Sequence, residues 1–376
     1  MKSKRNNTDI IDTFVDDRNK KSPVRRIGGF LLRFLSFVMV VAVLLAIALL
    51  TAIWLVSRGP SPTVQRLFVL TVKETSAGGF LADIFLSEEE VDLIMNPTDK
   101  NYEDDSFQTD TSLISISPQR PQFSGYDRPQ NNPDDDDDDD DTGQTDDTSG
   151  VELHEVNGVG YRGYMLIVHD PKRVFVGTLP SYGGAGWSVT EHVNRNDALA
   201  GVNGGGFEDP DGQGSGGMPD GVVIANGVLR SGASPERPCV MGFDADGVLH
   251  VGYMSAGTAV NLGLKEAVAF GPALIINGTP QRFSSSGINP RTAIGQRADG
   301  AVLLLVVDGR QIDSLGATFQ NLVDIFLEFG AVNAGNLDGG ASTLMIYEGE
   351  VVNSGPTMIH PRRLPTTFLV RRLDEG

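Results

Sequence analysis

Residues 333–343 read Asn-Ala-Gly-Asn-Leu-Asp-Gly-Gly-Ala-Ser-Thr and connect a predicted helix to a predicted strand. The helix is predicted over residues 317–329, where apolar side chains recur at 3.6-residue spacing until Gly330. The strand is predicted over residues 344–347. Between them, Asp338 precedes paired glycines and two hydroxyls, so backbone N–H groups can approach a ligand closely. In isolation, the same residues also suit an ordinary turn with a solvated Asp.

The charge of the chain is unevenly distributed. The formal net charge is −19 over 376 residues, yet residues 1–33 hold nine Lys and Arg against four Asp. The rest of the chain is therefore strongly acidic, which argues against nucleic acid as the main partner.

Residues 34–56 form an uncharged run dominated by Val, Leu, Ala and Ile. A run of this length can cross a bilayer as a helix, and it is longer than the apolar part of a signal peptide. A buried core helix would have a polar face, which this run lacks. Basic residues precede the run, so the positive-inside rule predicts a cytoplasmic tail over residues 1–33, a single transmembrane helix and an extracytoplasmic remainder.

Two segments separate this helix from the main domain. Residues 57–96 are predicted to be a juxtamembrane segment, with an apolar stretch over residues 64–72 and a capped helix from Ser87 to Met95. Whether this segment packs toward the membrane or self-associates stays open. Residues 97–150 contain sixteen acids against three bases, including an unbroken Asp run over 134–141. Such a composition predicts a disordered acidic linker, a self-repelling stalk.

Residues 151–376 are predicted to form a β-rich domain of the α+β class. Leu303 begins an apolar run to residue 307 that suits a central strand buried on both faces. Helices are predicted near residues 190–199, 264–268 and 317–329. Cys239, the sole cysteine, is expected to be buried and inert. Five hairpin tips are expected from their Asn-Gly, Asp-Gly or Glu-Gly pairs, at residues 225–227, 244–247, 276–278, 298–300 and 347–349.

Four polar islands lie where strands meet loops, the usual place for functional groups on a rigid scaffold. Turn chemistry uses the same residue types, so each island alone has a structural explanation. The islands are Asn203-Gly-Gly-Gly-Phe207, Asn289-Pro-Arg-Thr-Ala-Ile-Gly295, Asp308-Gly-Arg310 and the stretch around Asp338.

In this order, the four islands resemble the phosphodiester glycosidase family, which includes the lysosomal uncovering enzyme and many bacterial proteins labelled as exopolysaccharide-related. The resemblance spans about residues 151–371. The family has Asp-Gly-Gly-Gly-Ser-Ser where this chain has Ala341 and Ser342-Thr343. The family's Glu-Arg-Pro near the carboxyl end is replaced by a stretch from His360 that contains Arg362 and Arg363.

The resemblance implies cleavage of the bond between a sugar C1 and a phosphate. The transition state is oxocarbenium-like, and the phosphate leaves easily, so a strong general acid is less necessary. A carboxylate near C1 and cationic or N–H donors around the phosphate remain to be supplied. Asp338 is expected to be that carboxylate and Arg291 the phosphate fork, with Asn203 orienting the substrate. Asp308 and Glu155 are second carboxylate candidates. The remaining substrate-binding candidates are Gly204, Gly205, Gly339, Gly340, Ser342, Thr343 and Arg362.

The leading hypothesis is a membrane-anchored extracytoplasmic hydrolase acting on sugar-1-phosphodiesters of envelope glycans or exopolysaccharide. The alternative is a non-catalytic surface protein that binds glycans, or an exopolysaccharide assembly factor, using the same pocket. The five His residues have no metal-ligand spacing, and no cofactor-binding motif is found, so neither a metal nor a cofactor is predicted.

Overall fold

The computed structural model describes residues 23–73, 79–95, 109–116, 150–209, 215–232, 236–283, 286–354 and 362–373. It divides into two units, residues 1–60 and residues 61–376, which are described separately. Most of the predicted cytoplasmic tail and most of the predicted acidic linker lie outside the described residues.

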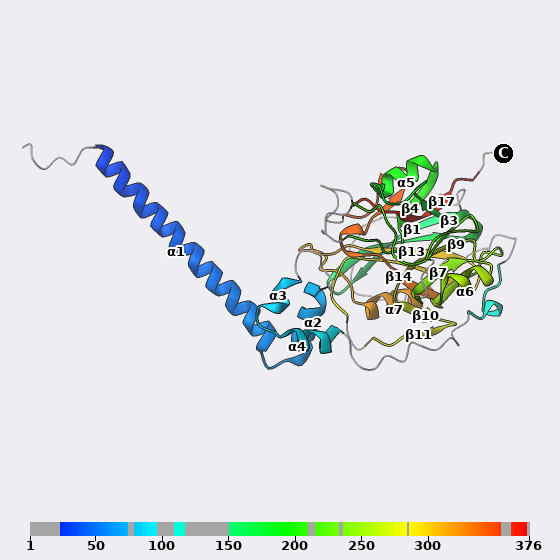
Figure 1. Cartoon of the computed structure of the whole chain (residues 1–376), viewed down its shortest axis with the longest axis horizontal. Helices are drawn as coiled ribbons and strands as arrows, with labels where there is room; N and C mark the ends of the chain where they lie inside the picture. The colour runs from blue at the N-terminus through cyan, green and yellow to red at the C-terminus, as the bar shows by residue number, and fades with distance from the viewer. Residues whose placement is uncertain are drawn as a thin grey trace, which may run out of the picture. The chain divides into compact units, whose positions relative to one another are not determined.

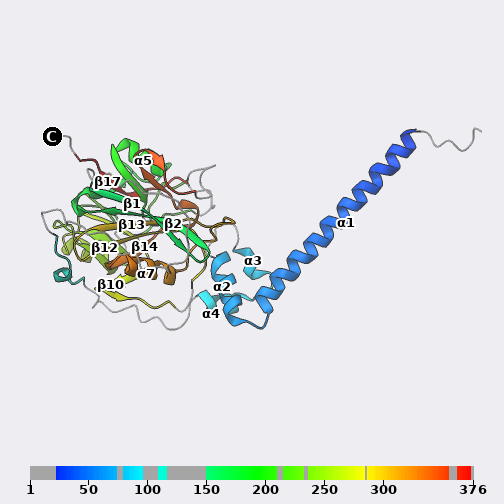
Figure 2. The ribbon, with the colours of Figure 1, turned by 180° about the vertical axis from the view of Figure 1, so that it is seen from behind.

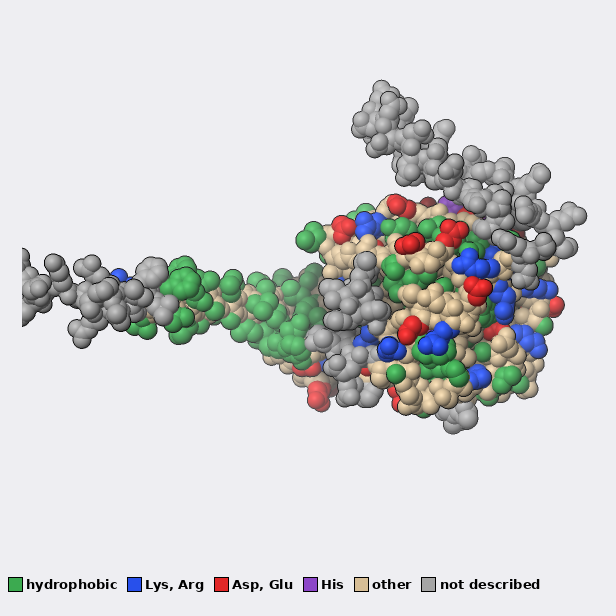
Figure 3. Space-filling model, turned by 90° about the horizontal axis from the view of Figure 1, so that it is seen from above, with side chains coloured by type: hydrophobic (Ala, Val, Ile, Leu, Met, Phe, Trp, Pro, Cys, Tyr) green, Lys and Arg blue, Asp and Glu red, His purple; other side chains and the backbone are tan. Residues whose placement is uncertain are grey.

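The first unit contains helix α1 (Pro23–Arg58). The part from Leu32 to Arg58 is long and apolar enough to cross a membrane, at about 1.5 Å per residue. From Leu32 to Leu50, its Leu, Val, Phe and Ile side chains are exposed (Figure 3). The predicted apolar helix over residues 34–56 is confirmed as a helix.

The second unit contains three antiparallel sheets (Figure 1). The seven-stranded sheet has the order β1 (Val151–Gly158), β2 (Tyr161–Val168), β13 (Val302–Val307), β12 (Arg291–Arg297), β14 (Ala331–Leu337), β10 (Ala273–Ile276) and β11 (Thr279–Pro280). The second sheet has the order β16 (Glu350–Val351), β15 (Met345–Tyr347), β4 (Ala198–Asn203), β17 (Thr366–Arg371) and β3 (Val174–Thr178). The third has the order β6 (Val228–Ser231), β5 (Val223–Ala225), β9 (Glu266–Phe270), β7 (Cys239–Phe243) and β8 (Leu249–Tyr253).

The central core is formed by side chains from all three sheets, and strand β13 shows why. Its alternate residues Val302, Leu304 and Val306 join this core, while Leu303 and Leu305 face the opposite side of the sheet. Successive side chains of a strand point to opposite faces, so a strand covered on both faces is apolar throughout. The predicted central strand is confirmed.

Helices cover the outer faces of the sheets (Figures 1 and 2). The apolar face of α7 (Phe319–Glu328) packs on the seven-stranded sheet, with Leu322 and Phe326 fully buried. Helix α5 (Val189–Arg195) packs on the second sheet and α6 (Ala256–Asn261) on the third. Thr318 caps α7 by accepting from the Asn321 N–H, so the predicted 317–329 helix is confirmed with slightly tighter bounds.

All five predicted hairpin tips are confirmed, and Asn226, Asn277 and Glu348 adopt positive φ there. The helix predicted near residues 264–268 is wrong, because this run contributes strand β9 at the centre of the third sheet. Short apolar runs carry no period that separates a helix from a buried strand. Cys239 is buried, as expected, and burial raises the pKa of its thiol to about 12.

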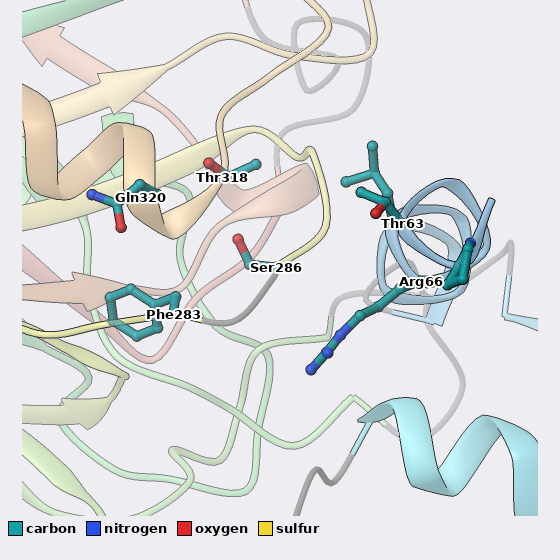
Figure 4. A pocket seen from close by; sticks show the side chains of 8 residues that line it. Thr63, Arg66, Phe283, Ser286, Thr318 and Gln320 are labelled. Atoms are coloured by element: carbon teal, nitrogen blue, oxygen red, sulfur yellow. The ribbon is translucent and has the colours of Figure 1, made fainter. Parts of the chain in front are cut away.

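The segment predicted to be juxtamembrane contains α2 (Pro62–Lys73), α3 (Phe80–Asp83) and α4 (Glu88–Met95), which share a small apolar cluster. Helix α2 also contacts the β-rich domain, where the Thr71 hydroxyl accepts from the Ile288 N–H at 3.1 Å. A cavity of about 400 Å³ lies between α2 and the start of α7, lined by Thr63, Arg66, Phe283, Ser286, Thr318 and Gln320, among others (Figure 4).

Part of the predicted linker is ordered against the β-rich domain. Residues 109–116 include the short 3₁₀ helix η1 (Thr111–Leu113) and the buried side chain of Ile114. The Thr109 hydroxyl accepts from the Val251 N–H at 3.2 Å, the Asp110 N–H donates to Asn277 at 2.8 Å, and the Ser115 N–H donates to Ala298 at 2.7 Å. The sequence analysis missed this part because the composition of residues 97–150 as a whole is acidic, although it contains the short apolar sequence Leu-Ile-Ser-Ile.

We expect a fragment starting at Val151 to unfold cooperatively but with a lower free energy of unfolding than the 61–376 fragment. It lacks the buried Ile114 side chain and the three hydrogen bonds formed by residues 109–116. Its free energy of unfolding should therefore be lower by about 2–4 kcal/mol. Urea unfolding followed by circular dichroism measures both fragments. A 109–376 fragment is the control and should recover most of the difference. Equal stability of the 151–376 and 109–376 fragments would contradict a stabilising role for residues 109–116.

Candidate active site

Strand β14 ends at Leu337, and Asp338 follows at the point where β4, β12 and β17 also have an end. Asn203, the last residue of β4, is fully buried and ties these strands together. Its Nδ2 donates to the Asp338 carbonyl, while its Oδ1 accepts from the Thr292 hydroxyl at 2.7 Å and the Leu344 N–H at 3.2 Å. Through these hydrogen bonds, the Asn203 amide positions the turn that begins at Asp338.

The glycines around Asp338 form hydrogen bonds within the protein. The N–H groups of Gly204 and Gly205 donate to the carbonyl and hydroxyl of Thr366, both at 3.1 Å. The Gly340 N–H donates to the Pro290 carbonyl at 2.8 Å. A Cβ on Gly339 would lie 2.8 Å from that same carbonyl oxygen, closer than real side-chain contacts. These glycines let β4 and the Asp338 turn pack closely, so the structure gives them a packing role where phosphate contacts were expected.

The Asp338 side chain is half-buried, and its Oδ2 is a buried atom. Among the residues that the structure describes, this Oδ2 has no hydrogen-bond partner. Burial raises the pKa of the Asp338 carboxyl to about 6, and the negative charge of Asp209 adds to this effect. Hydrogen bonds from the Ser342 side chain and the Gly339 N–H, and the positive charge of Arg362, act in the opposite direction. A desolvated carboxylate that has an oxygen without a hydrogen-bond partner is typical of a functional group.

A charged pair lies beside this carboxyl. Arg362, just before β17, forms an ion pair with Asp209, and both side chains are largely buried. The Arg362 guanidinium also lies 5.6 Å from the centre of the Phe207 ring. The structure therefore places Arg362 next to Asp338, together with Phe207 and Asp209, which the sequence analysis did not select. Asp209 lies two residues after the glycine-rich island. The signal that could have identified it is the need of a partly buried Arg for an acidic partner.

Arg291 binds elsewhere. Its Nε donates to the Ala317 carbonyl at 3.1 Å, and an Nη donates to the Gly287 carbonyl at 2.8 Å. The guanidinium lies over the Phe319 ring at 4.3 Å, and the residue is 6% exposed. Arg291 thus holds the start of α7 on the sheet, and its role as a phosphate fork stays a prediction.

The other candidates do not join Asp338 directly. Asp308 is fully buried and accepts from the Asn353 side chain at 3.0 Å and the Ser354 N–H at 3.2 Å. Glu155 is exposed on β1, an edge strand of the seven-stranded sheet. Thr343 is fully buried, and its carbonyl accepts from the Asn353 side chain at 3.3 Å. Of the predicted residues, the structure thus groups Asp338 with Asn203, Ser342, Arg362 and the four glycines.

We expect Asp209→Asn to lower the pKa of the Asp338 carboxyl. The substitution removes a negative charge beside it and frees the positive charge of Arg362 from its partner. Arg362→Gln should raise the same pKa. Titration of ¹³C-labelled Asp carboxyl groups by nuclear magnetic resonance measures both shifts, with Asp338→Asn used to assign the signal. An unchanged pKa in both variants would show that this pair does not act on Asp338.

Known proteins resemble this chain over the residues that contain the site. The sequence profile of the phosphodiester glycosidase family matches residues 196–371. The SPbeta prophage-derived uncharacterized protein YomE of Bacillus subtilis is 32% identical over 181 residues, covering 44% of this chain and 27% of that protein. The N-acetylglucosamine-1-phosphodiester alpha-N-acetylglucosaminidase of Bos taurus is 28% identical over 154 residues, covering 35% of this chain and 29% of that protein.

This chain thus spans less than a third of the length of each of these two curated relatives. Among solved structures, the catalytic domain of the zebrafish N-acetylglucosamine-1-phosphodiester alpha-N-acetylglucosaminidase aligns with a TM-score of 0.49 and 22% identity, covering 59% of this chain and 82% of that one. The site at the end of β14 lies within the matched residues. Through residues 196–371, this chain belongs to the phosphodiester glycosidase family.

Proposed function

We propose that this protein is a membrane-anchored hydrolase that cleaves the bond between a sugar C1 and the phosphate of a sugar-1-phosphodiester, in envelope glycan or exopolysaccharide metabolism. The observation that carries the proposal is the Asp338 carboxyl. Among the described residues its buried Oδ2 has no hydrogen-bond partner, and its pKa is raised to about 6. The family membership of residues 196–371 supports the reaction class.

In the proposed reaction, the C1–O bond to phosphate breaks as water adds to C1, and a phosphomonoester leaves with the bonding electron pair. Positive charge develops at C1, and a carboxylate beside it stabilises that charge, as a base or as a nucleophile. Above about pH 6, Asp338 is ionised and suits this role. The hydrogen bond to Ser342 and the contact of Asn203 with the Asp338 backbone hold the carboxylate in place.

The bond that breaks identifies the reaction class. The full chain in detergent micelles would be incubated with alkyl phosphodiesters of several sugar 1-phosphates in ¹⁸O-labelled water. The bovine relative's name specifies N-acetylglucosamine-1-phosphodiester, so that compound is the first to test. A glycosidase yields free sugar carrying ¹⁸O and an unlabelled phosphomonoester. Release of sugar 1-phosphate instead would mean cleavage at phosphorus and would refute the proposal.

A non-catalytic glycan-binding or assembly role is the second candidate, because the expected phosphate fork Arg291 is engaged by backbone carbonyls. In that case, the same phosphodiesters would bind without any product being formed. Saturable binding measured by calorimetry, together with no free sugar after prolonged incubation, would favour this role.

The proposed topology places residues 1–33 in the cytoplasm and the β-rich domain outside. Its support is the excess of basic residues before the apolar helix and the length of that helix. Protease added to intact cells should release a fragment cut within residues 97–150 and leave the amino-terminal tail protected. Release of the domain only after lysis would contradict this orientation.

A further inference from the structure

A cavity separates the first half of α2 from the β-rich domain. The second half of the helix contacts the domain, where the Thr71 hydroxyl accepts from the Ile288 N–H at 3.1 Å. Thr63, Arg66 and Leu67 belong to the same helix face as Thr71, because residues three and four apart are neighbours on a helix surface. Earlier in the helix this face lies away from the domain, and the space between them measures about 400 Å³.

The wall opposite α2 combines an aromatic ring with polar groups (Figure 4). Phe283 is half-buried, and its ring packs against the Phe319 ring with 5.3 Å between their centres. Ser286 is 4% exposed, and its hydroxyl accepts from the Phe319 N–H at 2.7 Å. Within the described part of the chain, no acceptor for the proton of this hydroxyl is found. The cavity wall therefore offers a ligand an apolar ring and an O–H donor, both fixed against the start of α7.

This combination matches the chemistry of a sugar ring. A pyranose has C–H groups on its faces and hydroxyls around its rim, so it can pack on an aromatic ring while polar side chains hydrogen-bond its edge. The hydroxyl of Thr63 and the amide of Gln320 also line the cavity and suit such an edge. The volume of about 400 Å³ lies in the range of small-molecule sites. A lipid chain would offer no acceptor to the buried Ser286 donor, which is unfavourable.

The cavity lies at the same end of β12 as the candidate active site. Ala317 directly precedes the cavity-lining N-cap of α7, and its carbonyl accepts from the Arg291 Nε at 3.1 Å. Arg291 begins β12, and the hydroxyl of the next residue, Thr292, donates to the Asn203 side chain at 2.7 Å. The same Asn203 side chain donates to the Asp338 carbonyl. A short series of direct contacts therefore connects the cavity wall to the Asp338 turn.

We propose that this cavity is a second glycan-binding subsite, which takes a neutral sugar ring packed on Phe283 and hydrogen-bonded to the Ser286 hydroxyl. It holds a sugar of the substrate glycan other than the one whose bond to phosphate is cleaved. The inference rests on the proposed function for the glycan nature of the substrate, and it assigns no catalytic role to the cavity.

Isothermal titration calorimetry of the full chain in detergent micelles tests the subsite. The probes are the methyl β-glycosides of N-acetylglucosamine, glucose, galactose and mannose, which carry no phosphate. Thr63→Trp fills the cavity from α2 and should weaken binding of the tightest probe by about tenfold or more. Val64→Trp is the matched control, because Val64 is the next residue, is 47% exposed and does not line the cavity, so its affinity should stay within about twofold of the parent.

Two substitutions of Phe283 test the stacking contact. Phe283→Leu keeps an apolar side chain but removes the ring, and it should weaken sugar binding about three- to tenfold. Phe283→Tyr keeps the ring and should bind as the parent does. Thermal unfolding verifies that each variant is folded, and Thr63→Trp, at an exposed position, carries the test if Phe283→Leu is not.

No binding of any of the four glycosides, or equal affinity of Thr63→Trp and Val64→Trp, would overturn the inference. Hydrolysis of a sugar-1-phosphodiester with a methyl aglycone is the separate readout, and Thr63→Trp should hydrolyse it at the parent rate. Cavity-dependent sugar binding in a chain without hydrolytic activity would uphold the subsite and refute the proposed function. Hydrolysis without cavity-dependent sugar binding would do the reverse.

Discussion

Asp338→Asn should lower the turnover of a sugar-1-phosphodiester by about two to four orders of magnitude, or ~3–5 kcal/mol of transition-state stabilisation. Asn keeps the size of the side chain and its hydrogen-bonding capacity. It removes the negative charge that would face the developing positive charge at C1. Steady-state kinetics on the parent and variant chains measure the effect. Normal activity of the variant would remove Asp338 from the mechanism.

The same substitution should increase stability at neutral pH. The pKa of Asp338 is about 6 in the folded protein and 3.8 in the reference state, so between these values the folded protein binds more protons than the unfolded chain. The free energy of unfolding therefore falls as the pH rises from about 4 to about 6, and it stays lower above pH 6. An Asn at this position has no such charge to desolvate.

We expect Asp338→Asn to gain about 1–2 kcal/mol over the parent at pH 7.5, a figure reduced for the partial exposure of the side chain, and to lose this advantage near pH 4. Urea unfolding at the two pH values measures the difference. Lower stability of the variant at pH 7.5 would instead identify Asp338 as a structural turn residue. Higher stability with lost activity is the combination expected of a functional carboxylate.

The sequence predicted the local features of the fold well because their causes are local. Asn226 and Asn277 precede glycines in tips that require positive φ, and few residue types tolerate it. The β9 strand and the ordered residues 109–116 depend on distant partners instead. Glu266 begins β9 and accepts from the N–H groups of Val176 and Asn226, far away in the sequence. No window of sequence around residue 266 contains this information.

The candidate site was predicted in part for the same reason. Asp338, Ser342 and Asn203 belong together because a strand end and its turn place them there. The Arg291 side chain lies away from Asn203 because consecutive residues of a strand point to opposite faces. Thr292 faces Asn203 and binds it, so Arg291 beside it points toward α7 and Phe319. The motif contains both residues, and only the register of β12 against β14 decides which one faces the site.

Asp308→Asn should have the opposite pattern to Asp338→Asn, with a large loss of stability. The Asp308 carboxylate is fully buried and accepts hydrogen bonds from the Asn353 Nδ2 and the Ser354 N–H, and it lies 3.7 Å from Arg162. An Asn at this position presents an NH₂ group to one of these donors and removes the charge that faces Arg162. A buried donor without an acceptor and a cation without its partner cost about 2–4 kcal/mol together.

Thermal and urea unfolding at pH 7.5 measure this loss, and Asp313→Asn is the matched control. Asp313 also pairs with Arg162, at 3.2 Å, but its side chain is 58% exposed, so its replacement should change the free energy of unfolding by less than about 1 kcal/mol. The activity of Asp308→Asn should follow only the fraction of folded protein. If the variant is as stable as the parent but inactive, Asp308 takes part in the chemistry. In a purely structural role, Asp308 instead fixes the Asn353 side chain. Asn353 in turn donates to the Thr343 carbonyl and accepts from the Met345 N–H, so it holds the end of the turn that carries Asp338.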